Sequence, residues 1–376
     1  MHQPQNIEEI CSIVANAVSG GTKLEILGGG TRADFGAPNR VAAQLCLRAL
    51  SGIIEYDPAE LVLTARAGTT LAELNAAVAK KNQGFAFEPW GAEGSTIGGI
   101  IAAGVAGARR ISAGSVRDHL LGFEAVSGRG EAFRAGAKVV KNVTGYDLPK
   151  LLCGSWGRLA VLTEVTLKLL PRPPERLTLL WRGLADEPAF ALMREAMRQP
   201  VDVAAAAYLP GQATLIRLDG FGPSVAARRV HLTAARAHYG APEALGEAES
   251  APLWAACQGG AALPPEPPLW RLSLPPRQAL AAITPLAELG GHYVADWAGG
   301  LIWLALAGHE ETIRAQAEIA GGHAALARAP AELRARIPAL HPQPPGIEAL
   351  SRRVRRAFDP LCVFETNRFL DEPNAN

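Results

Sequence analysis

Residues 89–104 read PWGAEGSTIGGIIAAG, a run in which small side chains replace the larger ones that a buried segment usually carries. Glycine and alanine have little or no side-chain volume, so a neighbouring group can approach the backbone closely. Two structures explain this pattern equally well. One is a large flat ligand lying on the backbone, and the other is close packing between a helix and a strand.

A second glycine-rich segment, LEILGGGT, occupies residues 24–31. Its first four residues form a brief apolar run that is typical of a strand, and the run ends at three glycines. Without side chains, consecutive backbone N–H groups can turn toward an anion such as a pyrophosphate. A Rossmann fingerprint needs a helix directly after the glycines, but residues 32–38 have no helical periodicity. A plain tight turn remains the alternative.

A third segment, residues 138–150, reads KVVKNVTGYDLPK and is followed by GSWGRLAVLTE at residues 154–164. The segment contains lysines, an asparagine and a threonine beside a strand that is interrupted by glycine. These side chains can donate hydrogen bonds to the carbonyl groups of a ring and to the oxygens of a phosphate. For Lys138 and Lys150, ordinary solvated surface charge is the alternative.

In this order and spacing, the three segments resemble the FAD-binding domain of the vanillyl-alcohol oxidase, or PCMH-type, flavoprotein superfamily. The resemblance covers about residues 5–171. It implies that the pyrophosphate lies on the first glycine loop and the flavin on the loop at Thr96. The isoalloxazine edge would lie near the strand before Thr163. The residues that it assigns to FAD binding are Gly28, Gly29, Gly30, Thr31, Pro89, Gly94, Ser95, Thr96, Gly98, Gly99, Ala102, Arg110, Gly114, Lys141, Gly157 and Val161.

Three further phrases resemble one subfamily, the FAD-binding E subunits of bacterial glycolate oxidases. They are RRISAGSVRD at residues 109–118, KNVTGYD at 141–147 and FDP at 358–360. Some superfamily members attach FAD covalently through a histidine beside the first loop or a cysteine in the second. Here Thr31 and Thr96 stand in loops with neither residue, so the resemblance implies noncovalent FAD. The tail reads FETNRF where the subfamily has an Asn-Pro-Gly phrase, so no particular flavin contact is expected from it.

Composition excludes several other classes of protein. The 376 residues are 48% hydrophobic and 19% charged, which describes a folded globular chain. A net charge of +1 removes the usual electrostatic driver of nucleic-acid binding. The five cysteines never come within metal-ligand spacing, so no metal site is expected. Because no uncharged stretch approaches the ~20 residues that span a bilayer, we expect a cytoplasmic protein without a direct membrane span.

A proline cluster at residues 171–174 divides the chain. Residues 1–171 are predicted to form an α+β, two-subdomain FAD-binding domain of the PCMH type. Its expected elements are a helix capped by Asn6, strands at 24–27, 61–67 and 159–170, a helix from Thr70 to about Asn82, and a hairpin at 120–134. The segment between the first two strands is expected to be rich in loops.

Residues 175–340 are predicted to form an α+β cap domain, because strand-like and helix-like pieces alternate there. Strands are expected at 213–218, 269–274 and 301–306, and helices at 187–198, 224–238, 277–289 and 310–319. No sequence repeat is visible, although two similar βαβ halves would fit. After a proline-rich linker, residues 346–376 are expected to form a basic helix and a tail that return to the first domain.

Flavin-dependent oxidation of a 2-hydroxy acid needs a base for the hydroxyl proton and a cation for the carboxylate. The eight histidines include none at metal-binding spacing with a carboxylate. The His-rich phrase of the resembling catalytic subunits is also absent. His292 is the nearest candidate for the base and Arg271 for the cation. A surface histidine and an outward-facing arginine are the alternatives.

The resemblance therefore implies an FAD-dependent oxidoreductase that acts as one subunit of a glycolate (2-hydroxy acid) oxidase complex. Its expected partners are a homologous FAD-containing catalytic subunit, an iron–sulfur subunit and a small 2-hydroxy acid substrate. The iron–sulfur subunit would pass electrons to the membrane quinone pool, so contact with the inner membrane would be indirect. Two alternatives remain: a stand-alone FAD-dependent D-lactate or 2-hydroxy acid dehydrogenase, and a non-catalytic flavoprotein scaffold.

Overall fold

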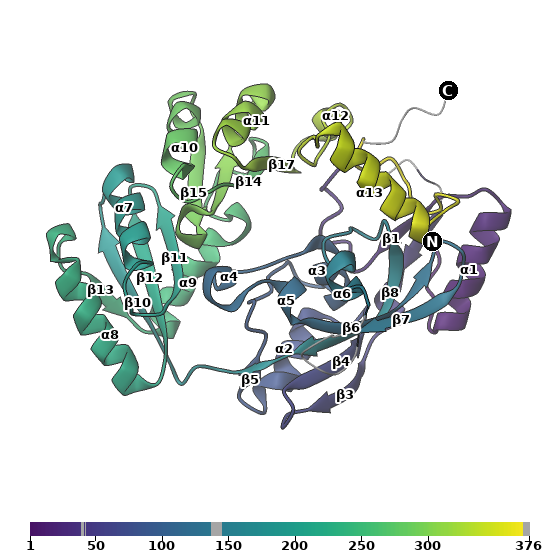
Figure 1. The fold of residues 1–376 in the computed structure, drawn as a ribbon, viewed down its shortest axis with the longest axis horizontal. Helices are drawn as coiled ribbons and strands as arrows, with labels where there is room; N and C mark the ends of the chain where they lie inside the picture. The colour runs from purple at the N-terminus through teal and green to yellow at the C-terminus, as the bar shows by residue number, and fades with distance from the viewer. Residues whose placement is uncertain (39–40, 42, 137–144, 371–376) are drawn as a thin grey trace.

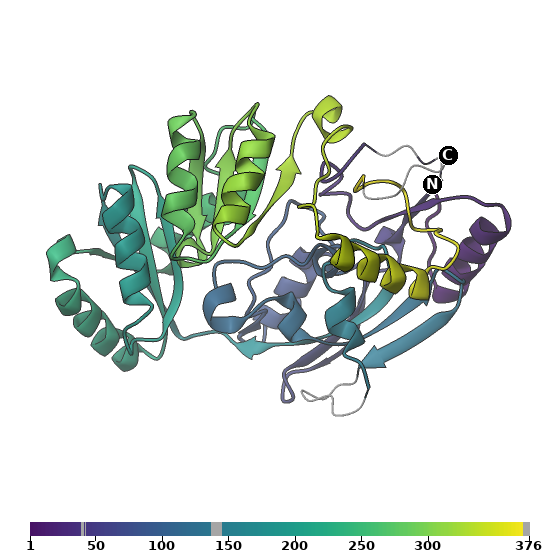
Figure 2. The same ribbon diagram turned by 45° about the horizontal axis from the view of Figure 1, so that its top comes forward.

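Two α+β domains lie side by side in the computed structural model, which describes residues 1–38, 41, 43–136 and 145–370 (Figure 1). We refer to them as the N-terminal domain and the cap domain. Helix α13 and the tail return to the N-terminal domain after the chain has completed the cap domain, as Figure 2 shows. The α+β class expected for both domains is confirmed.

The larger sheet of the N-terminal domain has the strand order β3-β4-β8-β6-β7, and every neighbouring pair is antiparallel. Its strands are β3 (Ile53–Asp57), β4 (Val62–Arg66), β6 (Leu120–Ser127), β7 (Ala132–Gly136) and β8 (Ala160–Lys168). Helices α2 (Leu71–Ala79), α3 (Ile97–Ala103), α5 (Val116–His119) and α6 (Leu148–Leu152) share one apolar core with this sheet. Thr70 caps α2, and its side chain accepts a hydrogen bond from the Glu73 amide, as the sequence predicts.

The second part of the N-terminal domain is a parallel pair, β1 (Leu24–Leu27) and β2 (Ala43–Cys46), covered by α1 (Ile7–Ser19). Asn6 caps α1 by accepting a hydrogen bond from the Glu9 amide. Apolar residues of α1 and β1 pack with Val363 and Phe364 of the C-terminal tail. Part of the tail therefore packs against this domain.

The cap domain contains one antiparallel sheet with the order β13-β10-β12-β11-β15-β16-β14-β17. Its first half runs β10 (Glu175–Arg182), α7 (Asp186–Ala196), β11 (Val203–Leu209), β12 (Ala213–Gly220), α8 (Gly222–Ala235), β13 (Glu243–Leu245). Its second half repeats that order with β14 (Leu269–Ser273), α10 (Ala279–Glu288), β15 (His292–Asp296), β16 (Leu301–Ala305), α11 (Glu310–Ile319), β17 (His323–Arg328). The two halves thus share one βαββαβ order and meet where β11 pairs with β15.

The two faces of the cap sheet have different partners. Helices α7, α8, α10 and α11 pack on one face and form the largest apolar core with it. The opposite face packs on α9 (Glu247–Cys257) and on Ala106 and Ala108 of the N-terminal domain. The side chains on this second face are therefore the ones that can meet a ligand bound to the N-terminal domain.

The sequence prediction misses several elements. The segment between β1 and β4 is rich in loops, as expected, but it also contains the short strands β2 and β3, which were not predicted. The helix α9, which carries an internal Pro252, was not expected, and neither were β11 and β17. Both of these strands are rich in alanine, whose high helix propensity hides a strand that tertiary contacts impose.

Candidate functional site

The two glycine-rich loops of the N-terminal domain lie directly against each other. A Cβ atom on Gly28 would stand 2.3 Å from Thr96 Oγ1, and one on Gly29 would stand 1.9 Å from the Gly94 carbonyl oxygen. Thr31 and Ser95 are also joined by a hydrogen bond of 2.9 Å between their hydroxyl oxygens. Gly28 and Gly29 are therefore required for contact between the loops.

The glycines of α3 have two different roles. A Cβ atom on Gly98 would lie 2.7 Å from the Ala67 Cβ, so Gly98 allows α3 to pack on the end of β4. A Cβ atom on Gly99 would have one neighbour within 4 Å, Thr96 Oγ1 at 3.3 Å. Gly99 faces a groove. Close packing therefore explains Gly98, whereas the structure leaves an open groove beside Gly99.

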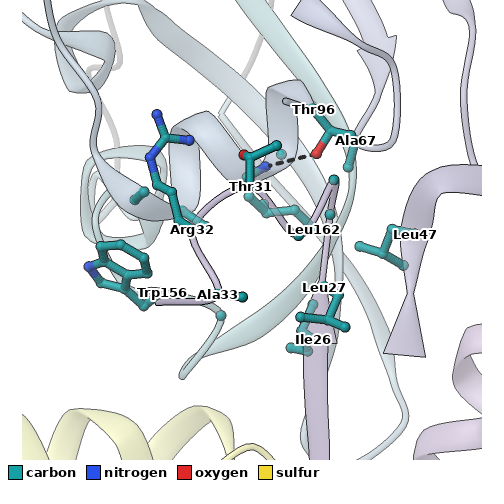
Figure 3. A pocket seen from close by; sticks show the side chains of 18 of the residues that line it. Ile26, Leu27, Thr31, Arg32, Ala33, Leu47, Ala67, Thr96, Trp156 and Leu162 are labelled. Atoms are coloured by element: carbon teal, nitrogen blue, oxygen red, sulfur yellow. Dashed lines mark hydrogen bonds between the residues drawn. The ribbon is translucent and has the colours of Figure 1, made fainter. Parts of the chain in front are cut away.

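This groove runs between the first glycine loop and the segment that contains Trp156 (Figure 3). Its floor and walls are formed by Ile26–Ala33, Leu47, Ala67, Thr96, Gly98, Gly99, Ala102, Ala103, Ser155–Gly157, Ala160, Leu162 and Arg368. The backbone amides of Gly29, Gly30 and Thr31 donate no hydrogen bond to any described residue. Gly30 has φ of +71° and no atom within 4 Å of a built Cβ, so this turn is open to a ligand.

The outer wall of the groove is built partly by the C-terminal tail. The ring of Trp156 stacks on Phe35 with centroids 4.1 Å apart and planes 4° from parallel. Arg368 donates hydrogen bonds to the carbonyl oxygens of Phe35 at 2.7 Å and Arg32 at 2.6 Å, and its side chain lines the groove. The sequence prediction missed Arg368, because nothing in the FETNRF phrase signals that the tail lies here.

The structure brings many, but not all, of the predicted FAD-binding residues to the groove. Those that line it are Gly28, Gly29, Gly30, Thr31, Thr96, Gly98, Gly99, Ala102 and Gly157. Gly94 and Ser95 support the loop from behind, and half-buried Pro89 precedes Trp90. The Val161 side chain points into the core under α1, while its neighbours Ala160 and Leu162 line the groove.

Two of the predicted FAD-binding residues lie elsewhere, and a third is outside the described residues. Arg110 is the first residue of α4 (Arg110–Ala113) and lines a cavity next to the groove. Gly114 ends α4 with φ of +80°, and a Cβ there would lie 2.8 Å from Asp118 Oδ2. Lys141 and Lys138 of the third segment lie outside the described residues.

A cavity of about 1110 Å³ lies between the two domains and opens into the groove. The two spaces share Thr31, Arg32, Ala103 and Trp156 as lining residues. Strand alternation determines which cap residues face the cavity. They are Leu269, Arg271 and Ser273 of β14, Leu301 and Trp303 of β16, and His323, Ala325 and Ala327 of β17, with Arg328 added where the register of β17 shifts. A ligand in the groove can therefore extend into a space bounded by the cap sheet.

Arg271 faces this cavity rather than the solvent. Its guanidinium lies 5.3 Å from the Trp297 ring centroid and donates to Ser273 Oγ at 3.2 Å. Burial, followed by the nearby charge of Arg110, lowers the pKa of Arg271 to about 10. The side chain remains protonated at neutral pH. Its position at the cavity excludes the alternative of an outward-facing arginine.

The histidines of the cavity differ from the one that the sequence suggests. His292 is exposed at the start of β15 and is not a lining residue of the cavity. His323 and His341 line it instead. Burial, followed by the charge of Arg271, lowers the pKa of His323, so its neutral form is favoured. His341 is held by the Ala324 amide, 3.3 Å from Nδ1, and by Glu318, 3.1 Å from Nε2.

Groove and cavity together fit an FAD molecule. Unpartnered amides suit the pyrophosphate, and the apolar and aromatic walls around Trp156 and Leu162 suit flat rings. The lining residues of the groove include no histidine and no cysteine. The nearest thiol to the first loop, that of Cys46, is buried with its sulfur 3.8 Å from the Gly28 carbonyl oxygen.

Comparison with known proteins gives relatives over most of the chain. The FAD binding domain family matches residues 1–136. The chain is 38% identical over 320 residues to glycolate oxidase subunit GlcE of Escherichia coli (strain K12), covering 83% of this chain and 84% of that protein. It is 33% identical over 178 residues to glycolate oxidase subunit GlcD of Bacillus subtilis (strain 168), covering 47% of this chain and 38% of GlcD.

Further relatives extend the comparison. A D-lactate dehydrogenase of Archaeoglobus fulgidus is 34% identical over 203 residues, 54% of this chain and 44% of that enzyme. The chain thus matches less than half the length of this enzyme and of GlcD. A solved structure of alkyldihydroxyacetonephosphate synthase superposes with a TM-score of 0.66 at 14% identity, covering 96% of this chain and 75% of that one, which shows the shared fold. Among the described residues, no helix could cross a membrane and no group of three or more His, Cys, Asp or Glu could hold a metal ion.

Proposed function

The chain belongs to the family of the glycolate oxidase subunit GlcE, a family of FAD-linked oxidoreductases, and we propose that it is the FAD-binding subunit of a complex that oxidises glycolate or a related 2-hydroxy acid. The product would be the corresponding 2-oxo acid, glyoxylate in the case of glycolate. One observation carries this proposal: the groove beside the first glycine loop continues into a cavity that contains a half-buried, protonated arginine.

FAD is proposed to bind noncovalently, with its pyrophosphate on the amides of Gly29, Gly30 and Thr31 and its rings along Gly99 and Ala102. The absence of histidine and cysteine from the groove lining supports this. When bound, the flavin would supply the oxidant for the α C–H bond of the acid. The protein would contribute the orientation of the acid and the exclusion of water from a cavity closed by two domains.

Arg271 is proposed to bind the substrate carboxylate, because a guanidinium is the side chain best suited to that planar anion. His292 has no comparable support, since it does not line the cavity. We also propose that a homologous FAD-containing subunit and an iron–sulfur subunit complete the complex. The cysteine spacing of this chain suits no cluster, so its electrons would leave through a partner. The assembly would be cytoplasmic, with any contact with the inner membrane made by the partners.

The test is to compare the isolated chain with the assembly copurified from its native host. We expect glycolate or D-lactate turnover with an artificial electron acceptor to be at least about 100-fold slower for the isolated, FAD-loaded chain, since general acid–base help alone is worth about 10²–10⁴-fold. Equal turnover by the isolated chain would replace the subunit proposal with a stand-alone dehydrogenase. The position of Arg271 and His323 at the same cavity favours this second candidate. A protein without visible flavin absorbance would be a scaffold.

A further inference from the structure

The cavity contains two guanidinium groups that have no carboxylate partner in the described part of the chain. The Arg110 guanidinium carbon lies 4.6 Å from the ring centroid of Trp297, and that of Arg271 lies 5.3 Å from the same centroid. Neither side chain makes an ion pair with a described residue. The adjacent residue behaves differently, because Arg109 pairs with Asp219 of the cap domain at 3.4 Å.

These two arginines come from different domains and are held near each other by the interface. Arg110 begins α4 of the N-terminal domain, whereas Arg271 lies at the middle of β14, between Trp303 of β16 and Ala325 of β17. The indole nitrogen of Trp297 donates a hydrogen bond of 3.0 Å to the Gly107 carbonyl oxygen, three residues before Arg110. Their common neighbour is therefore fixed to both domains.

The other charged groups that line the cavity already have partners. Arg32 donates to the Trp90 carbonyl at 2.9 Å, and Arg328 donates to the Pro264 carbonyl at 3.3 Å. Asp34 lies 3.4 Å from Arg334. Of the imidazoles, His341 is paired with Glu318, and the lowered pKa of His323 favours its neutral form. Arg110 and Arg271 are therefore the lining arginines that donate to no backbone carbonyl and pair with no carboxylate in the described part of the chain.

Two like charges in a partly desolvated space disfavour each other, and the positive charge of Arg110 contributes to the low pKa of Arg271. An anion placed between them would relieve this repulsion and satisfy donors that now face an open cavity. A phosphate of FAD is a poor candidate for that anion, because the unpartnered amides lie in the groove and Arg110 lines only the cavity.

We propose that Arg110 and Arg271 together bind the carboxylate of the 2-hydroxy acid across the domain interface, so that this chain has its own substrate site. This inference rests on the proposed function and moves Arg110 from cofactor binding to substrate binding. It also explains why the site needs both domains, since each contributes one guanidinium. The ligand class is a small monocarboxylic acid with an oxygen on the adjacent carbon.

The experiment uses the full FAD-loaded chain and oxalate, which presents the same adjacent oxygens but has no hydrogen to transfer. Oxalate binding is followed by the change in flavin absorbance, and flavin content per chain is measured separately. We expect Arg110→Gln and Arg271→Gln each to raise the oxalate Kd by about 10- to 100-fold, which corresponds to a charge-assisted hydrogen bond. Flavin content should not change. Arg353→Gln, at an exposed position of α13 (Pro345–Phe358), is the matched control and should leave both measurements unchanged.

Arg110→Lys gives a second measurement if Arg110→Gln does not fold, and its Kd should lie between those of the wild type and Arg110→Gln. Loss of flavin from the Arg110 variants with unchanged oxalate affinity of the remaining holoprotein would return Arg110 to the cofactor site and overturn the inference. An unchanged Kd, or a wild-type holoprotein that binds no oxalate, would also overturn it while leaving the flavin assignment intact. A wild-type chain that contains no flavin would overturn the proposed function and this inference together.

Discussion

Arg217 Nη2 lies 2.7 Å from Glu88 Oε1, and this ion pair joins the cap domain to the N-terminal domain two residues before Trp90 of the cavity wall. The pair is well shielded, since the Arg217 side chain is 7% exposed and that of Glu88 is 18% exposed. Glu88 has φ of +46°, and a Cβ on Gly107 would lie 2.3 Å from its carbonyl oxygen. The backbone conformation at Glu88 and the missing side chain at Gly107 therefore allow these two segments to approach closely.

Removing Arg217 should destabilise the domain interface. Arg217→Met would leave Glu88 and the buried Asp219, 3.4 Å from Arg217, without this cation. Because Arg109 still pairs with Asp219 and Arg176 lies 3.8 Å from Glu88, we expect a loss of about 1–3 kcal/mol in the free energy of unfolding, as for a shielded group that loses one partner. Denaturant unfolding measures it, and limited proteolysis reports separation of the domains.

The matched control is Arg182→Met, which removes an exposed ion pair with Glu243 in the same sheet. This variant should unfold close to the wild-type denaturant concentration, because solvent screens the pair. An equal loss in the two variants would show that the interface pair contributes no more than a surface pair.

If FAD is bound noncovalently, acid precipitation should release the yellow colour into the supernatant, at about one flavin per chain. The physical reason is that the groove lining has no histidine or cysteine to form a covalent link. Absorbance of the supernatant and the pellet is the measurement. Colour that remains in the pellet would contradict this and direct attention to His323 or His341 of the cavity.

Gly99→Asp should abolish flavin binding while the fold survives. A built Cβ at Gly99 meets one atom, at 3.3 Å, so the carboxylate would project into the groove and oppose an anionic cofactor. Gly346→Asp is the control, because that glycine begins an exposed helix and has no atom within 4 Å of a built Cβ. Flavin content and circular dichroism of both variants test it. Equal flavin retention would make Gly99 a packing residue.

The loops of the site are predictable from sequence because they are local patterns. The glycine runs at 28–30 and 94–99 identify segments where backbone must approach closely, and the structure places both at one groove. Pattern alone does not separate a glycine that admits a ligand from one that admits another loop. Gly29 and Gly99 differ only in what stands beside them, which is a tertiary property.

Contacts between distant residues are what the sequence could not predict. Arg368 completes the wall of the groove although it is 333 positions from Phe35, its hydrogen-bond partner. Arg271 reaches the cavity because β14 lies between β16 and β17, and that strand order has no signal in the LWRLS phrase itself. For the same reason, His323 was overlooked and exposed His292 was suggested.

The last prediction concerns Asp296, which lies 3% exposed at the end of β15, directly before Trp297. Its Oδ1 accepts a hydrogen bond of 2.7 Å from the Trp297 amide, yet burial raises the pKa of the carboxyl to about 7. In the unfolded chain the group would titrate near the ordinary value of 3.8. Folding therefore favours the protonated form, so the contribution of this group to stability is complete below about pH 4 and is lost as the pH rises toward 7.

Asp296→Asn replaces the carboxyl with a neutral group of similar shape that can still accept the Trp297 amide. We expect the variant to melt above the wild type at pH 8 and the difference in Tm to shrink toward pH 4, where the wild-type carboxyl is itself protonated. Thermal melts at several pH values measure this, with Asp202→Asn at an exposed position as the control. A difference in Tm that is the same at pH 5 and pH 8 would contradict the prediction, because the benefit would then not come from removing a buried charge. Since Asp296 holds the amide of Trp297, whose ring lies near both Arg110 and Arg271, the same titration should alter oxalate affinity in the wild type but not in Asp296→Asn.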